Sequence, residues 1–177
     1  MAFLVLFSCK NKNNSNFFKA YDESELIQKQ QAHNISRMKF KLVQSKVLDM
    51  NANFKPFNDD LAINFSEEEY NKLKPLILEQ NIPSIQKSIS EGLLSHEKLT
   101  LFYLYRIRKF ESNNETALNA IISLNPDAIK EARARDLNRD NNKLLLDMSM
   151  YGMPVLIKDN INTAGMPTTA GAIVLSK

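Results

Sequence analysis

Glycine is scarce in this chain, and its placement constrains the fold more than any other feature. The chain has four glycines in 177 residues, and three of them, Gly152, Gly165 and Gly171, fall within the last 26 residues. Glycine adopts left-handed backbone conformations without steric cost, so tight turns concentrate where glycines do. We therefore expect a mainly helical chain before Gly152 and a change to turns and extended segments after it.

The composition describes a globular protein with a core. Hydrophobic residues make up 44% of the chain, charged residues 24%, and the net charge is +3. The positive charge is scattered and forms no basic stripe, which argues against a nucleic-acid partner. The two histidines, His33 and His96, are far apart in sequence, so we interpret them as solvated residues on helix surfaces. The sequence predicts no metal site and no cofactor.

The N-terminus resembles the end of a bacterial lipoprotein signal. An apolar run at 2–7 leads to Ser8 and to Cys9, the one cysteine, so residues 1–9 are interpreted as a signal remnant and Cys9 as the lipidated residue. Residues 10–22, which begin with the polar run KNKNNSN, would form a flexible tether from the membrane of the cell envelope. The alternative is a buried N-terminal segment of a cytoplasmic protein, because no basic residue precedes Cys9.

Residues 23–83 are predicted to form a helical extension. Apolar residues recur at helical spacing across 23–50, which predicts one long amphipathic helix, and the polar stretch 51–64 with Pro56 predicts a connection. Ser66, followed three residues later by Glu69, is a capping box that opens a helix reaching to about Gln80 around Pro75.

The chain from 84 to 177 is predicted to be an incomplete α/β domain. Ser84 would cap a short helix that stops at Gly92, and Ser95 would cap a second helix with one apolar face. A β-prone run at 117–124, a helix at 126–139 opened by Asn125 and Pro126, and a strand at 155–158 follow. This order predicts a βαβ unit with a parallel strand pair near the C-terminus of a mostly helical fold.

Lys158 directly follows this last strand, where functional residues of α/β sheets usually lie. Two interpretations are open from the residues alone. The lysine is either solvated and charged, as most lysines are, or buried and neutral, in which case it can act as a general base.

Three segments resemble the amidase signature family. The run GMPVLIKDN at 152–160 is similar to the family pattern G-[IM]-P-[IV]-x-[IVL]-K-D-N, and MPTTAG at 166–171 is similar to the turn that follows it. Upstream, LNAIISLNP at 118–126 is similar to the family's L-N-A-x-x-x-x-N-P segment. The helical hairpin at 84–110 also resembles the family's, so the resemblance covers the chain from about residue 84 to its end.

The resemblance implies an α/β fold and hydrolysis of a carboxamide C–N bond by a Ser, cis-Ser, Lys triad. Lys158 matches the family's catalytic lysine, whose pKa of about 10.4 must fall by roughly three units, about 4 kcal/mol, before it can accept a proton. Asp159 and Asn160 would orient the loop. The matching turn near the lysine comprises Thr168, Thr169 and Gly171.

The chain also departs from the family pattern. Residues 147–152 read DMSMYG where the family has G-P-L-H-G, and Ala172 stands in place of a serine. The Gly-Ser-rich segment with the nucleophile and cis-serine would lie beyond Lys177, and neither Ser149 nor Ser176 has that context. We therefore expect an N-terminal part of an amidase that is inactive alone.

Three interpretations of that incompleteness are open. The chain is the opening of a longer amidase, one half of a split amidase completed by a missing C-terminal half, or a non-catalytic helical interaction module. In the first two cases the partner is a small-molecule or peptide amide. The resemblance identifies the bond that is cleaved and not the amide that carries it.

Overall fold

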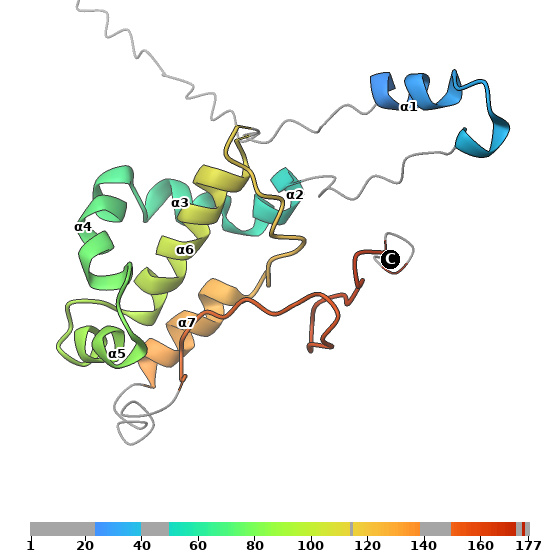
Figure 1. The fold of residues 1–177 in the computed structure, drawn as a ribbon. Helices are drawn as coiled ribbons and strands as arrows, with labels where there is room; N and C mark the ends of the chain where they lie inside the picture. The colour runs from blue at the N-terminus through green and yellow to red at the C-terminus, as the bar shows by residue number, and fades with distance from the viewer. Residues whose placement is uncertain (1–23, 40–49, 114, 139–149, 173–174, 176–177) are drawn as a thin grey trace, which may run out of the picture.

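The fold is a layer of short helices around one long helix, followed by an extended C-terminal segment (Figure 1). It comes from a computed structural model that describes residues 24–39, 50–113, 115–138, 150–172 and 175. The expected signal remnant, with Cys9, and the tether at 10–22 lie outside the described residues. Among the described residues, no helix has the length and apolar character needed to cross a membrane.

The prediction of one long helix across 23–50 is wrong for the residues that the structure describes. The chain forms helix α1 at Ser24–Gln31 and a 3-10 turn, η1, at Ser36–Met38; residues 32–35 separate them, and Ile35 is extended. The His33 Nδ1 accepts a hydrogen bond from the Ile35 backbone N–H at 3.1 Å, and such local bonds compete with helical ones. Ile35 and Met38 are exposed, so no packing opposes the break. Residues 40–49 lie outside the described part.

The connection predicted at 51–64 is helical instead. Helix α2 spans Met50–Phe54, the 3-10 turn η2 spans Lys55–Phe57, and α3 spans Asn58–Ile63. Pro56 does not interrupt this run because it lies in the first turn of η2, where a missing N–H costs little. The segment is ordered by burial of its apolar side chains, which are Met50, Phe54, Phe57 and Leu61.

Two predicted helices are confirmed at their N-termini, and a third begins earlier than predicted. Helix α4 spans Glu67–Ile77 behind the Ser66 cap, and α6 spans His96–Glu111 behind the Ser95 cap. Helix α5 spans Ile82–Ser90 and is capped by Asn81, not by Ser84, whose N–H donates to Asn81 Oδ1 at 2.9 Å. Pro83 favours this register because proline is well suited to the first helical turn.

Helix α6 lies at the centre of the helical layer. It packs against α3, α4 and α7, and α7 spans Ala128–Leu137. Its Leu99 and Phe102 are fully buried, and the Phe102 ring stacks on Tyr70 of α4 with centroids 4.7 Å apart. The apolar core of α2 to α7 thus forms around this helix, while α1 lies apart from it in Figure 1.

The βαβ unit predicted near the C-terminus is not present in the described residues, where neither 117–124 nor 155–158 is a strand. The first run is diverted locally, because the Glu111 carboxylate accepts the N–H groups of Leu118 at 3.1 Å and Ala120 at 3.2 Å. Between them, Asn119 has a φ of 53°, which a strand does not tolerate. Helix α7, expected at 126–139, begins two residues later at Ala128.

Candidate functional site

Lys158 lies on an extended segment that leaves the helical layer after a turn at residues 150–153. The turn closes through the Met153 N–H, which donates to the Met150 carbonyl at 3.1 Å. From Pro154 to Lys158 the side chains are exposed. Within the described residues, the Lys158 ammonium has no carboxylate in ion-pair contact, and only its backbone carbonyl is engaged, by the Ile161 N–H at 2.9 Å.

Asp159 organises the loop that follows the lysine. Its carboxylate accepts hydrogen bonds from the Thr169 N–H at 2.9 Å, from the Thr169 hydroxyl, and from the Gly171 N–H at 3.1 Å. Its carbonyl accepts the Ala170 N–H at 2.9 Å. The hydrogen bonds from the Thr169 side chain and backbone lower the pKa of Asp159. Asp159 is therefore joined to Thr169 and Gly171, ten and twelve positions further along, in one loop.

The structure brings some of the predicted site residues together and leaves others apart. Asp159, Thr169 and Gly171 are in mutual contact, and Thr169 is buried. The Thr168 hydroxyl donates to the Ile161 carbonyl at 3.4 Å, away from the Asp159 carboxylate. Asn160 is exposed.

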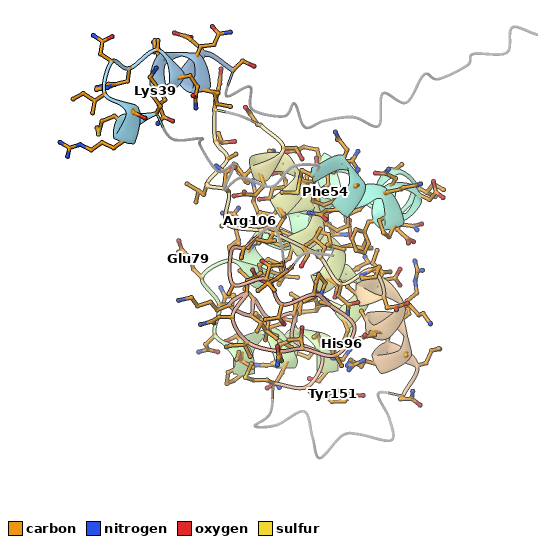
Figure 2. The ribbon with its side chains drawn as sticks, turned by 90° about the vertical axis from the view of Figure 1, so that its right-hand side faces the viewer. Lys39, Phe54, Glu79, His96, Arg106 and Tyr151 are labelled. Carbon is orange, nitrogen blue, oxygen red and sulfur yellow. The ribbon has the colours of Figure 1, made fainter. Side chains whose placement is uncertain are left out.

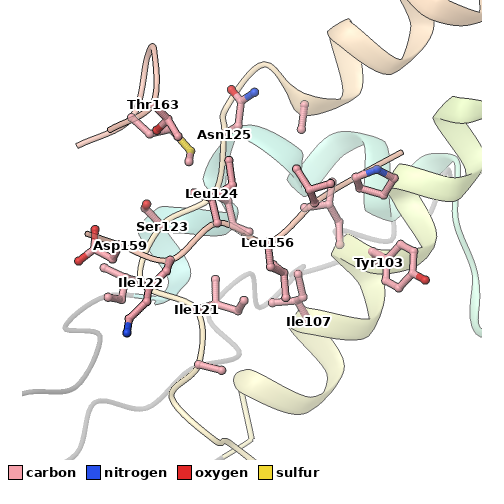
Figure 3. Close-up of a pocket in the computed structure, with 18 of the residues that line it drawn as sticks. Tyr103, Ile107, Ile121, Ile122, Ser123, Leu124, Asn125, Leu156, Asp159 and Thr163 are labelled. Carbon is pink, nitrogen blue, oxygen red and sulfur yellow. The ribbon is translucent and has the colours of Figure 1, made fainter. Parts of the chain in front are cut away.

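Lys158 borders an apolar groove of about 1880 Å³ between the helices and the extended segment (Figure 3). One wall is α6, with Tyr103 and Ile107, and another is the connection that carries Ile121 and Leu124. Several apolar side chains at its rim are exposed: Leu118, Ile122, Val155, Leu156 and Ile157. The groove thus offers an apolar surface beside a lysine and an ordered polar loop.

A buried histidine at the base of this segment was not expected from any pattern in the sequence. His96 was predicted to be solvated, but it is fully buried at the N-terminus of α6, which corrects that prediction, whereas His33 is exposed. The His96 ring meets Tyr151 edge to face, with centroids 5.9 Å apart, and Figure 2 shows the two residues side by side. A helix-start position looks solvated in sequence, and only its contact with distant residues buries it.

The described residues bring no three His, Cys, Asp or Glu side chains together in a way that could hold a metal ion. Apart from Lys158, the charged side chains that line the groove are engaged in hydrogen bonds. Glu111, for example, is engaged by two backbone N–H groups.

The amidase family model matches residues 98–177. A probable amidase of Arabidopsis thaliana is 35% identical over 100 residues, which are 56% of this chain and 19% of that protein. A glutamyl-tRNA(Gln) amidotransferase subunit of Bdellovibrio bacteriovorus is 34% identical over 96 residues, 54% of this chain and 18% of that one. The chain thus spans about a fifth of the length of these relatives.

A solved structure shows the same relationship in three dimensions. The crystal structure of an amidase family protein from Bacillus anthracis superposes with a TM-score of 0.60 at 36% sequence identity. The match covers 69% of this chain and 23% of that one. Sequence and structure thus point to the same relatives: residues 98–177 match the amidase family model, and the fold is similar to that of an amidase family protein.

Proposed function

We propose that the chain supplies the lysine-bearing part of a carboxamide hydrolase, with Lys158 as the general base. The observation that carries the proposal is the position of Lys158, exposed at the rim of an apolar groove and directly before the loop that Asp159 holds. The match to the amidase family model supports an amide as the substrate. The groove gives that amide, or the polypeptide that completes the site, an apolar surface.

The chemistry requires Lys158 to be neutral when it acts. A neutral amine can take the proton of a serine hydroxyl as the serine oxygen attacks the amide carbonyl, and the departing amine then receives a proton. Covering the lysine would favour this neutral form, since burial disfavours the charged form.

The serine partners of this lysine are proposed to come from polypeptide outside these 177 residues. Ser149 and Ser176 lie outside the described residues, and neither stands in a Gly-Ser-rich context. One relative of this chain is itself one subunit of an amidotransferase, which favours completion by other polypeptide, in the same chain or as a separate subunit. The exposed apolar rim of the groove supports such an association.

The test begins with the DNA beyond the codon for Lys177. If a Gly-Ser-rich segment is encoded there or in an adjacent frame, it is expressed with this chain and assayed on simple carboxamides. We expect hydrolysis by the assembly and none by the 177-residue polypeptide. Lys158→Met should lower kcat/KM by a factor on the order of 10³ or more, as loss of a catalytic base does.

Lys130→Met is the matched control, because Lys130 is an exposed lysine on α7 that does not border the groove. It should leave the activity unchanged. Activity that survives Lys158→Met would refute the assignment of the base. A complex that forms but hydrolyses no amide with Lys158 intact would support the alternative function, a non-catalytic interaction module.

We also propose that Cys9 is lipidated and tethers the protein at the cell envelope, on the sequence of residues 6–9 alone. Expression of the natural gene, with the DNA upstream of Met1, followed by membrane fractionation tests this. We expect the protein in the membrane fraction, with a mass that differs from that of the unmodified polypeptide, and Cys9→Ser in the soluble fraction. Wild-type protein of unchanged mass in the soluble fraction would refute the tether.

A further inference from the structure

The base of the lysine segment is held by a buried histidine that the proposed chemistry does not use. The His96 Nδ1 lies 2.8 Å from Asp136 Oδ1, and since a carboxylate only accepts, Nδ1 carries the hydrogen. Asp136 also accepts the backbone N–H groups of His96 at 2.8 Å and Glu97 at 2.9 Å. One carboxylate of α7 therefore fixes both the first turn of α6 and the orientation of the imidazole.

The opposite edge of the imidazole faces Gly152. A Cβ atom at Gly152 would lie 2.1 Å from His96 Cδ2 and 2.4 Å from Nε2, far inside van der Waals contact. Nε2 is buried and, within the part of the chain that the structure describes, has no hydrogen-bond partner. Leaving a buried polar atom unpaired costs free energy. The hydrogen bond to Asp136 and the packing of the ring against the Gly152 backbone offset that cost and hold the ring in place.

Gly152 is also where the backbone turns towards the lysine. Its φ is +71°, and the turn between Met150 and Met153 closes around it. Tyr151 contributes a second contact, because its ring lies edge to face with His96 and under the Arg135 guanidinium, 5.7 Å away. Beyond this turn, the side chains of Pro154 to Ile157 are exposed.

We propose that His96 is a positioning residue for Lys158. Asp136 fixes the imidazole, and the imidazole packs against Gly152. This contact sets the direction in which the lysine segment, residues 154–158, leaves the helical layer. The Asp159 loop holds the other end of the segment, so Lys158 lies between two fixed points. What Lys158 does rests on the proposed function, but how it is placed does not.

A comparison of two glycines tests this in the 177-residue polypeptide. Gly152→Ala and Gly165→Ala both force alanine into a left-handed conformation, at φ values of +71° and +81°. Only the first places a methyl group against His96, because nothing lies within 4 Å of the Cβ position at Gly165. The readouts are the Lys158 amide resonance in ¹H–¹⁵N NMR and the hydrogen-exchange rate of the Met153 amide.

We expect Gly152→Ala to move the Lys158 resonance and to speed exchange at Met153 by about tenfold or more, because the turn opens locally. Gly165→Ala should leave the Lys158 resonance unmoved and the exchange rate of the Met153 amide within about twofold of wild type. Exchange from the buried turns of α6 should be unchanged in both variants, which separates loss of positioning from loss of stability. Equal effects of the two substitutions on Lys158 and Met153 would overturn the proposal.

His96→Ala supplies the second measurement. With the ring removed, the methyl group of Gly152→Ala has room, so its effect on Met153 exchange should fall to that of Gly165→Ala. The same effect of Gly152→Ala in both backgrounds would also overturn the proposal. If His96→Ala does not fold, the comparison of the two glycines decides alone. None of these readouts requires amide hydrolysis, so a failure of the proposed function leaves this test intact.

Discussion

Asp159 shows how a single carboxylate can shape the surroundings of the residue before it. It accepts three hydrogen bonds from Thr169 and Gly171, and these bonds lower its pKa. Ala170, between these two residues, has a φ of 49°, so the loop contains a conformation that alanine adopts only at a cost. The carboxylate offsets that cost most strongly while it is ionised, because the negative charge strengthens the hydrogen bonds that it accepts.

The loop should therefore loosen in acid. The folded pKa of Asp159 lies below its ordinary value of 3.8, so its contribution is complete above that value and is lost as the pH falls through the folded pKa. We expect the Thr169 and Gly171 amides to exchange faster and to shift upfield below pH 3.8 in NMR spectra. Asp159→Asn should abolish this pH dependence, and an unchanged titration in that variant would contradict the assignment.

Tyr105 on α6 gives a prediction at alkaline pH. Burial and the hydrogen bond from its hydroxyl to Glu67 Oε2, at 2.6 Å, raise the pKa of Tyr105 to about 12. Because this value lies above the ordinary value of 10.0, stability should fall as the pH rises from 10.0 towards 12. Tyrosine absorbance should show one late ionisation, which Glu67→Gln moves to lower pH. Ionisation of all tyrosines near pH 10.0 would contradict this.

At the scale of elements, one arginine ties three helices together. Arg133 of α7 donates from Nε to Glu97 of α6 at 2.9 Å and from a terminal nitrogen to Asp60 of α3 at 2.5 Å. Its side chain is 43% exposed, so solvent weakens both ion pairs. The link nevertheless joins the helix before the lysine segment to the rest of the layer.

Arg133→Met should lower the free energy of unfolding by about 1 kcal/mol, since it removes both charged hydrogen bonds while keeping an apolar stem. Lys130→Met is the control on the same helix, and its side chain is 85% exposed. It should change stability by less than about 0.5 kcal/mol. Urea denaturation followed by circular dichroism measures both, and equal effects would show that the link does not stabilise the layer.

At the scale of the whole molecule, the apolar groove is the least protected surface. Leu118 is 83% exposed and Leu156 is 80% exposed at its rim. A contiguous apolar surface of this kind usually marks an interaction site or a tendency to aggregate. The groove therefore makes the 177-residue polypeptide prone to associate unless another segment covers it.

The 177-residue polypeptide should self-associate at micromolar concentration through this groove. Leu118→Lys with Leu156→Glu should return it towards the monomer in sedimentation velocity. The matched control is Ile63→Lys with Leu137→Glu, because these residues are 79% and 87% exposed but do not border the groove. A control that disperses the protein equally well would show that the groove is not the contact surface.

The sequence by itself determined the features that depend on neighbouring residues. The caps at Ser66 and Ser95 were predicted and are confirmed, because a cap is a bond between residues three apart. The resemblance to the amidase family was also recognisable from the lysine segment, because the motif around Lys158 is contiguous. The roles of Lys158 and Asp159 in catalysis stay predictions.

Tertiary structure decided the features that depend on distant partners. Residues 117–124 have the composition of a strand, but Glu111 takes two of their N–H groups, and a strand forms only where its N–H groups meet another strand. His96 looks solvated in sequence and is buried because Asp136, forty residues further along, pairs with it. Local patterns specify what a segment prefers, and long-range hydrogen bonds and packing decide whether that preference is met.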